Sequence, residues 1–174
     1  MPATDLAREF TAYARGKLAQ HLAQIERCVA LLGPDELWQR ANAHSNSIGN
    51  LILHLQGNVR QWILAGLAGE EFKRDRPAEF AERGPLPAAQ VVGALRSTVQ
   101  RAMSTISALD ERSLPARRTI QGYEVSALAA VFHVVEHFAG HAGQIVYATK
   151  VLKDVDLSQY DPHGRKQAGD TQMP

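Results

Sequence analysis

Apolar side chains recur at three- and four-residue intervals through four long stretches of this chain, with glycine- and proline-containing segments between them. Such intervals place apolar side chains along one face of a helix, which can then pack on a core. The pattern predicts four long helices, at residues 4–32, 46–67, 87–109 and 126–152. Gly33 and Pro34 end the first helix. Asn46 or Ser47 is the expected N-terminal cap of the second, and Ser126 is that of the last.

Between the second and third predicted helices, residues 69–87 lose the helical period and become polar. Arg74 and Arg76 stand close to Glu79 and Glu82 in this segment. Charges of mixed sign at such spacing are typical of a solvated surface on which the ions pair with one another. We therefore expect this segment to be an exposed connection.

Helical patterns dominate the chain, and only residues 118–125 could form an extended segment. Four long helices joined by connections of these lengths predict an all-α fold, a four-helix bundle. We expect one domain over residues 1–153. Residues 154–174 contain Asp, Gly and Pro without a period, and we expect a loosely ordered C-terminal tail there.

Composition narrows the classes of function. The 174 residues carry a formal net charge of +1, so a broad nucleic-acid-binding face, which needs an excess of Lys and Arg, is not expected. No apolar stretch is long enough to span a bilayer, and the charged residues near the N-terminus argue against a signal peptide. The single cysteine, Cys28, cannot form an internal disulfide. The expected location is the cytoplasm, with no membrane partner and no nucleic-acid partner.

Three of the seven histidines, His133, His137 and His141, fall within nine residues of the last predicted helix. Side chains four residues apart lie on one helix face, roughly 6 Å apart, so an adjacent pair can bind one metal ion. The outer two are separated by roughly 12 Å of helix rise and cannot share an ion. A mononuclear site therefore needs a further ligand from another helix. His54, among apolar neighbours in the second predicted helix, is the candidate.

The spacing alone does not decide which adjacent pair of histidines is used. His133 and His137 form, with Glu136, the pattern His-x-x-Glu-His of inverted zinc peptidases. That pattern needs a downstream glutamate as a ligand, and no glutamate follows Glu136. It would also leave His54 and His141 without a role. Di-iron bundles use Glu-x-x-His pairs, and the sequence contains none.

Two stretches resemble the DinB/YfiT-like superfamily: residues 45–55, which include the histidine of the second helix, and residues 137–145, with the pattern His-x-x-x-His-x-Gly-Gln. The combination of the two is the most specific element of the resemblance, which covers roughly residues 6–160. Three shorter stretches look closest to an uncharacterised branch of the superfamily, at residues 57–63, 78–84 and 120–125. The resemblance implies a four-helix bundle with a three-histidine metal site, in a homodimer.

Carried over residue by residue, the resemblance implies metal ligands at His54, His137 and His141, with His133 one turn outside the site. Three neutral imidazoles leave coordination positions open on a divalent ion, as in catalytic zinc sites. Zinc is the first expectation, with nickel or iron as alternatives, because imidazole suits all three metals. His44 stands in no comparable motif, so we expect no fourth protein ligand.

Related members of the superfamily include transferases and isomerases that use low-molecular-weight thiols, and others described as metal-dependent hydrolases. The resemblance therefore implies a metal-dependent enzyme in which the ion activates a thiol or water towards a small-molecule substrate. The alternative is a non-catalytic metal-binding module of a stress response that binds a partner. No residue is singled out as catalytic, and the candidate pocket groups are Asn50, Asn58, His133 and Tyr123.

Overall fold

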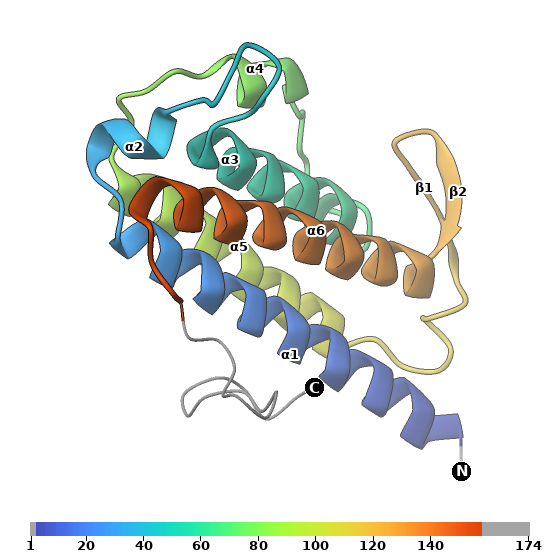
Figure 1. Ribbon diagram of the computed structural model, residues 1–174. Coiled ribbons are helices and arrows are strands. Elements are labelled where there is room, and N and C mark those ends of the chain that lie inside the picture. Colours follow the sequence, from blue (N-terminus) through green and yellow to red (C-terminus); the bar gives the residue numbers. More distant parts are fainter. Residues whose placement is uncertain (1–2, 158–174) are drawn as a thin grey trace.

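The computed structural model describes residues 3–157, and this part of the chain is mostly helical, as predicted. In chain order, its elements are α1 (Ala3–Ala30), α2 (Pro34–Trp38), α3 (Ile48–Val59), η1 (Arg60–Ala65), α4 (Arg76–Ala81), α5 (Ala88–Ser107), β1 (Arg117–Ile120), β2 (Tyr123–Ser126) and α6 (Ala127–Lys153). Four long helical segments dominate the molecule, namely α1, α3 with η1, α5 and α6 (Figure 1). Their bounds agree closely with those of the predicted helices.

Each long segment packs against two others around a shared apolar core. α1 contacts α5 and α6, and α3 also contacts α5 and α6, so α3 and α6 lie side by side (Figure 1). The apolar positions that predict the helices supply this core. Entirely buried side chains include Leu18 of α1, Leu55 of α3, Leu95 of α5 and Phe138 of α6. Burying a side chain of this size contributes roughly 1.5–3 kcal/mol to folding.

The second predicted helix starts at a well-formed cap and changes its hydrogen-bonding pattern near its end. Ser47 caps α3, because its Oγ accepts from the backbone N–H of Asn50 and the Asn50 side chain accepts in return from the Ser47 N–H. After Val59 the chain continues as the π-helical stretch η1, in which the Gly66 N–H donates to the carbonyl of Gln61. The apolar pattern of the sequence does not predict this turn. π turns are rare and often occur at functional sites.

The polar segment between η1 and α5 is exposed over much of its length, as predicted, but part of it folds against α3. It contains α4, whose cap is Asp75, with Oδ1 accepting from the Ala78 N–H. The side chains of Arg74 and Glu79 are only 5% and 11% exposed. The prediction of a solvated surface is therefore wrong for these two residues, which pair with each other away from solvent.

Trp38, at the end of α2, packs against the C-terminal end of the polar segment between η1 and α5. Its indole N–H donates to the carbonyl of Leu86. Its ring packs so closely on Gly49 and Gly84 that a Cβ at either position would lie 2.6 Å from it. Gly84 also has a φ of +77°, a conformation that favours glycine. This packing helps to hold α2 and α4 at the same end of the molecule (Figure 1).

The short extended region expected before the last helix is a two-stranded antiparallel hairpin of β1 and β2. It projects from the start of α6 (Figure 1). Ser126 caps α6 as predicted, with its Oγ accepting from the Ala129 N–H. α6 ends at Lys153, and the next residue, Asp154, has the left-handed backbone conformation.

Of the predicted C-terminal tail, residues 158–174 lie outside the described residues, and residues 154–157 contain no helix. Within residues 3–157, no helix combines the length and the apolar character that a membrane span requires.

Candidate metal centre

Three histidines from two neighbouring helices meet where α3 contacts α6. His54 stands in the middle of α3, and His137 and His141 stand one turn apart on α6. Their ligand nitrogens all lie within 4.8 Å of one another. His54 is 4% exposed, and the other two are half-buried. Within residues 3–157, this is the one group of three or more His, Cys, Asp or Glu side chains close enough to hold an ion.

The donor set fits a divalent metal ion. Two nitrogens bound to one tetrahedral zinc at roughly 2.0–2.1 Å lie roughly 3.3 Å apart. The Nε2 atoms of His54 and His137 are 3.0 Å apart, and no two ligand nitrogens in the group are more than 4.8 Å apart. Small side-chain movements would therefore bring these nitrogens to the separation that zinc requires. In the described chain no carboxylate or thiol joins the group, so an ion held here would keep open coordination positions.

Glu79 determines which nitrogen of His54 carries the proton. His54 Nδ1 lies 2.9 Å from Glu79 Oε2. Arg74 Nη2 is 3.1 Å from the same Nδ1, but its two hydrogens are taken by Glu79 Oε2, at 2.8 Å, and by the backbone carbonyl of His54, at 3.2 Å. Nδ1 therefore donates to the carboxylate, and Nε2 faces His137 as an unprotonated lone pair. A metal ligand requires this form of imidazole.

The Arg74–Glu79 pair occupies space that a glycine leaves open. Arg74 Nε donates to Glu79 Oε1 at 2.6 Å, and Arg74 Nη1 donates to Gln61 Oε1 at 2.9 Å. A Cβ at Gly57 would overlap Glu79 Oε1 and would lie 2.8 Å from Arg74 Nε. Burial raises the pKa of the Glu79 carboxyl, but hydrogen bonds from His54 and Arg74 outweigh burial and hold that pKa below its usual value.

Sequence reasoning missed this pair because it treated the charges as surface. Two local signals were available. Asp75 before Pro77 is a helix-start signature, which would have predicted α4. Gly57 in the middle of an apolar helix indicates a close approach by another part of the chain. Neither signal predicts that the Glu79 carboxylate is the group that contacts His54.

His141 is oriented from within its own helix. Its Nδ1–H donates to Oε1 of Gln144, at a distance of 2.7 Å. This hydrogen bond leaves Nε2 of His141 unprotonated. The rings of His54 and His141 lie 5.1 Å apart in an edge-to-face arrangement. Gln144, which the sequence analysis used only as part of a motif, therefore has a physical role at the site.

The surroundings of His137 and His141 favour the neutral form of both imidazoles. Burial, together with the neighbouring His141 and His54, lowers the pKa of His137 to about 3. Burial also lowers the pKa of His141, against a smaller effect of the Gln144 hydrogen bond, which raises it. Metal ligands must be deprotonated, so protons compete weakly for these nitrogens at neutral pH.

His133 stands outside the group, one turn before His137 on α6. Its ring stacks on His137 at 5.6 Å between centroids and lies 4.1 Å from the ring of Trp62 in η1. Asn58 Nδ2 donates to its Nε2 at 3.4 Å. Two buried atoms beside it, Asn58 Oδ1 and Trp62 Nε1, have no hydrogen-bond partner among the described residues. Such atoms are costly in a core, by about 1–3 kcal/mol each, unless a further group meets them.

Two other candidate pocket residues have different surroundings. Besides capping α3, Asn50 donates from Nδ2 to the carbonyls of Glu79 and Glu82, which fastens the α4 segment to α3. The Asn50 side chain, named above as a candidate pocket group, therefore has a structural role. Tyr123 is 64% exposed on the hairpin.

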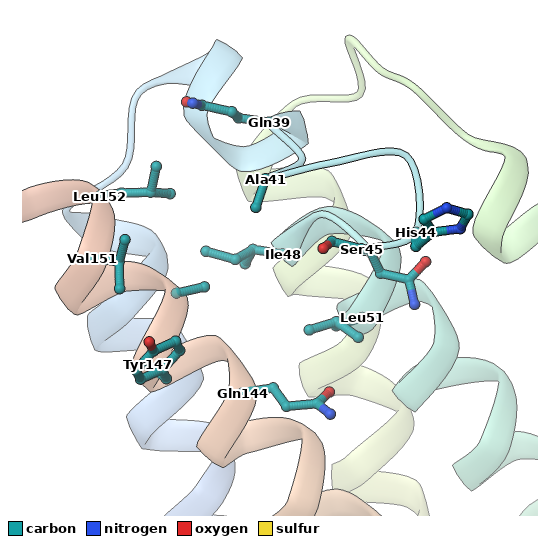
Figure 2. A pocket seen from close by; sticks show the side chains of 12 residues that line it. Gln39, Ala41, His44, Ser45, Ile48, Leu51, Gln144, Tyr147, Val151 and Leu152 are labelled. Atoms are coloured by element: carbon teal, nitrogen blue, oxygen red, sulfur yellow. The ribbon is translucent and has the colours of Figure 1, made fainter.

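A cleft of about 540 Å³ lies between α6 and the loop that precedes α3, and none of the three histidines lines it (Figure 2). Its walls are mostly apolar, and the side chains that supply them include Ile48, Leu51, Tyr147, Ala148, Val151 and Leu152. His44 lies at the loop side of the cleft and does not belong to the group of three histidines. Gln144 also lines the cleft. The residue that orients His141 therefore lies between the cleft and the group of three histidines. None of the described residues lining the cleft is Asp, Glu, Lys or Arg.

Residues 5–161 match the family described as "Protein of unknown function (DUF1572)". The chain belongs to the DUF1572 family. No curated protein matches the sequence of this DUF1572 protein.

Solved structures show that this DUF1572 protein has a DinB-like fold. A DinB-like protein from Bacillus cereus aligns with a TM-score of 0.59 and 15% identity, over 77% of this chain and 87% of its own. A conserved protein from Enterococcus faecalis aligns with a TM-score of 0.67 and 16% identity, over 89% of this chain and 99% of its own. The resemblance to DinB-like proteins is therefore confirmed, and at these identities it concerns the fold.

Proposed function

We propose that this protein binds one divalent metal ion through His54, His137 and His141 and that it is a metal-dependent enzyme acting on a small-molecule substrate. Zinc is the first candidate, with nickel and iron as alternatives. The proposed reaction is a transfer with a low-molecular-weight thiol or a hydrolysis with water. One observation carries the proposal: ligand nitrogens of three histidines, one from α3 and two from α6, converge within 4.8 Å.

The hydrogen bonds behind the rings support metal binding. Two of the three imidazoles, His54 and His141, donate their Nδ1–H to an acceptor and so keep Nε2 unprotonated. Ligating histidines in proteins are usually held in this way. A set of buried histidines without a ligand function would not need two separate acceptors that impose the same tautomer.

The open coordination positions and the cleft that Gln144 lines support an enzyme over a purely structural site. A structural zinc site is closed by four protein ligands, and the described chain offers three here. The cleft next to Gln144 is largely apolar and has no charged wall, so we propose that it takes an uncharged, mostly apolar part of the substrate.

Each protein group has a stated task in this proposal. When bound, the ion supplies Lewis acidity, which lowers the pKa of a coordinated water or thiol. Glu79 and Gln144 orient His54 and His141. The walls of the cleft exclude water from the apolar part of the substrate.

The architecture and assembly are further parts of the proposal. We interpret the four long helical segments as the four-helix bundle of the DinB/YfiT-like superfamily, since each packs on two others. We also propose a homodimer, which the exposed Leu128 and Phe132 of α6, 43% and 61% accessible, support as an apolar contact surface. Sedimentation of the wild type and of a Phe132→Glu variant tests it, and a monomeric wild type would contradict it.

The deciding experiment measures metal by elemental mass spectrometry after reconstitution with zinc, nickel or ferrous iron and removal of the excess. We expect about one ion per chain in the wild type and almost none in His54→Ala, His137→Ala or His141→Ala. His133→Ala is the matched control, because it removes a neighbouring histidine of the same helix and should keep the metal.

Three outcomes would each contradict a part of the proposal. Absence of metal in the reconstituted wild type would remove the metal site. Loss of metal in His133→Ala, with retention in His141→Ala, would favour the other histidine pair. A loaded protein that is inactive in screens of electrophilic and hydrolysable substrates, with and without thiols, would favour the non-catalytic module instead.

A further inference from the structure

The buried ion pair of Arg74 and Glu79 requires an explanation beyond fold stability. Both side chains are nearly inaccessible, at 5% and 11% exposure. A buried ion pair is a weak means of stabilising a fold, because well-packed apolar side chains in its place are often as stable or more stable. Such a pair is expected where a charge has a task, and the side chain that this carboxylate contacts outside the pair is the imidazole of His54.

We propose that Glu79 is a positioning residue of the metal centre, which holds His54 as the Nδ1–H tautomer with Nε2 directed to the ion, while Arg74 holds the Glu79 side chain in place. This inference rests on the proposed metal binding. It assigns a function to the segment around α4, which neither ligates the ion nor lines the cleft beside Gln144.

The contacts around His54 restrict the ring from several directions. Arg74 donates to the backbone carbonyl of His54 and to the carboxylate that receives its Nδ1–H, so one guanidinium links both ends of this residue. The ring of Phe80, also from α4, lies 4.7 Å from the imidazole. Gly57, one turn after His54, leaves the space that the ion pair fills. The imidazole can therefore neither rotate freely nor exchange its tautomer without breaking a charge-assisted hydrogen bond.

The alternative is that the pair only fastens the α4 segment to α3. Other contacts already do this through the backbone, since Asn50 donates to the carbonyls of Glu79 and Glu82 and Trp38 donates to that of Leu86. The side chain of Glu82 serves as the comparison. It accepts from the N–H groups of Arg83 and Gly84, so it shapes the same segment without contacting a histidine.

The experiment compares the zinc affinities of the wild type, Glu79→Ala, Glu79→Gln and Glu82→Ala by competition with a chromophoric chelator. We expect Glu79→Ala to bind zinc roughly 10- to 100-fold more weakly, the usual effect of losing such a partner. Glu79→Gln keeps an acceptor oxygen for Nδ1–H and should recover part of the affinity. Glu82→Ala should bind zinc as the wild type does.

A second measurement separates positioning from general destabilisation. Two-bond ¹H–¹⁵N correlation spectra of the metal-free protein report the tautomer of each histidine. His54 should be the Nδ1–H form in the wild type and in Glu82→Ala. In Glu79→Ala the Nε2–H form should become populated. A role limited to stability would change the melting temperature and leave this tautomer as it is.

Specific results would overturn the inference. Equal zinc affinity in Glu79→Ala and the wild type, or an equally large loss in Glu82→Ala, would remove the positioning role while leaving the metal site intact. A wild type that binds no metal would instead refute the proposed function, and this inference with it. If Glu79→Ala does not fold, the double variant Arg74→Met, Glu79→Met removes both charges together. Zinc bound normally by that folded variant would also overturn the inference.

Discussion

Gly57 and Glu79 approach each other so closely across the face of α3 that a Cβ on the glycine would overlap the Oε1 atom of the carboxylate. The atoms in the way are the ends of two side chains, Glu79 and Arg74, and not backbone. A Gly57→Ala protein can therefore keep its fold by displacing the ion pair. We expect zinc affinity to fall by roughly tenfold, the lower end of the effect of losing such a partner, because the displaced carboxylate no longer holds His54.

The control for this prediction is Gly93→Ala on α5, where an added Cβ meets nothing within 4 Å. Replacing a helical glycine by alanine there should raise stability by up to about 1 kcal/mol and leave zinc affinity unchanged. Competition with a chelator measures the affinities, and urea unfolding measures the stabilities. Equal zinc affinities in the two variants would show that the space at Gly57 has no bearing on the site.

Gln144→Leu should weaken zinc binding less than Glu79→Ala does. Both changes remove the acceptor of an Nδ1–H, but Gln144 is neutral and exposed, whereas Glu79 is charged and nearly buried. Charge-assisted hydrogen bonds are roughly twice as strong as neutral ones. We expect a loss of less than about tenfold for Gln144→Leu, measured by the same competition. A larger loss than in Glu79→Ala would contradict this ranking.

Metal uptake should change the tautomer of one histidine only. In the metal-free protein, Nε2 of His54 is an acceptor, so His137 must donate its Nε2–H across the 3.0 Å between them. His54 and His141 already carry their protons on Nδ1. Binding through Nε2 therefore requires His137 to switch from Nε2–H to Nδ1–H. Histidine ¹⁵N spectra before and after addition of zinc measure this, and a switch at His54 instead would refute the hydrogen-bond assignment.

The stability of the metal-free protein should depend on pH through His137. Its pKa is about 3 in the folded state, against about 6.5 for an unfolded histidine. Between these values the unfolded state binds more protons, so stability should fall as pH decreases below about 6.5 and be constant, for this group, above it. Urea unfolding in a chelator at pH 5 to 7 measures the slope, which should be smaller in His137→Gln. An identical slope in that variant would contradict the depressed pKa.

Local pattern was enough to predict the helices and their starts. The three- and four-residue period depends only on which side chains are apolar, and Ser47 and Ser126 cap their helices through contacts within three residues along the chain. The π turn of η1 escaped prediction because it keeps the same apolar face, so the period hardly changes when one turn widens.

The histidine group required knowledge of two helices at once. Four-residue spacing places His137 between two possible partners on α6, His133 and His141, and both pairs satisfy the same local geometry. Which of the two pairs lies next to His54 depends on where along its length α6 contacts α3, and only the tertiary structure shows this. The resemblance to the DinB/YfiT-like superfamily supplied this choice in advance, and the packing brings His54 together with His137 and His141.

The sequence by itself therefore determined what depends on neighbours along the chain: the helical period, the caps, and histidines spaced to share one face. The tertiary structure alone decided the environment of Arg74 and Glu79. Their local sequence is that of a charged surface, and nothing nearby in the chain indicates burial. The segment folds onto α3 at the point where Gly57 has no side chain, and that contact removes water from the pair and directs the carboxylate to His54.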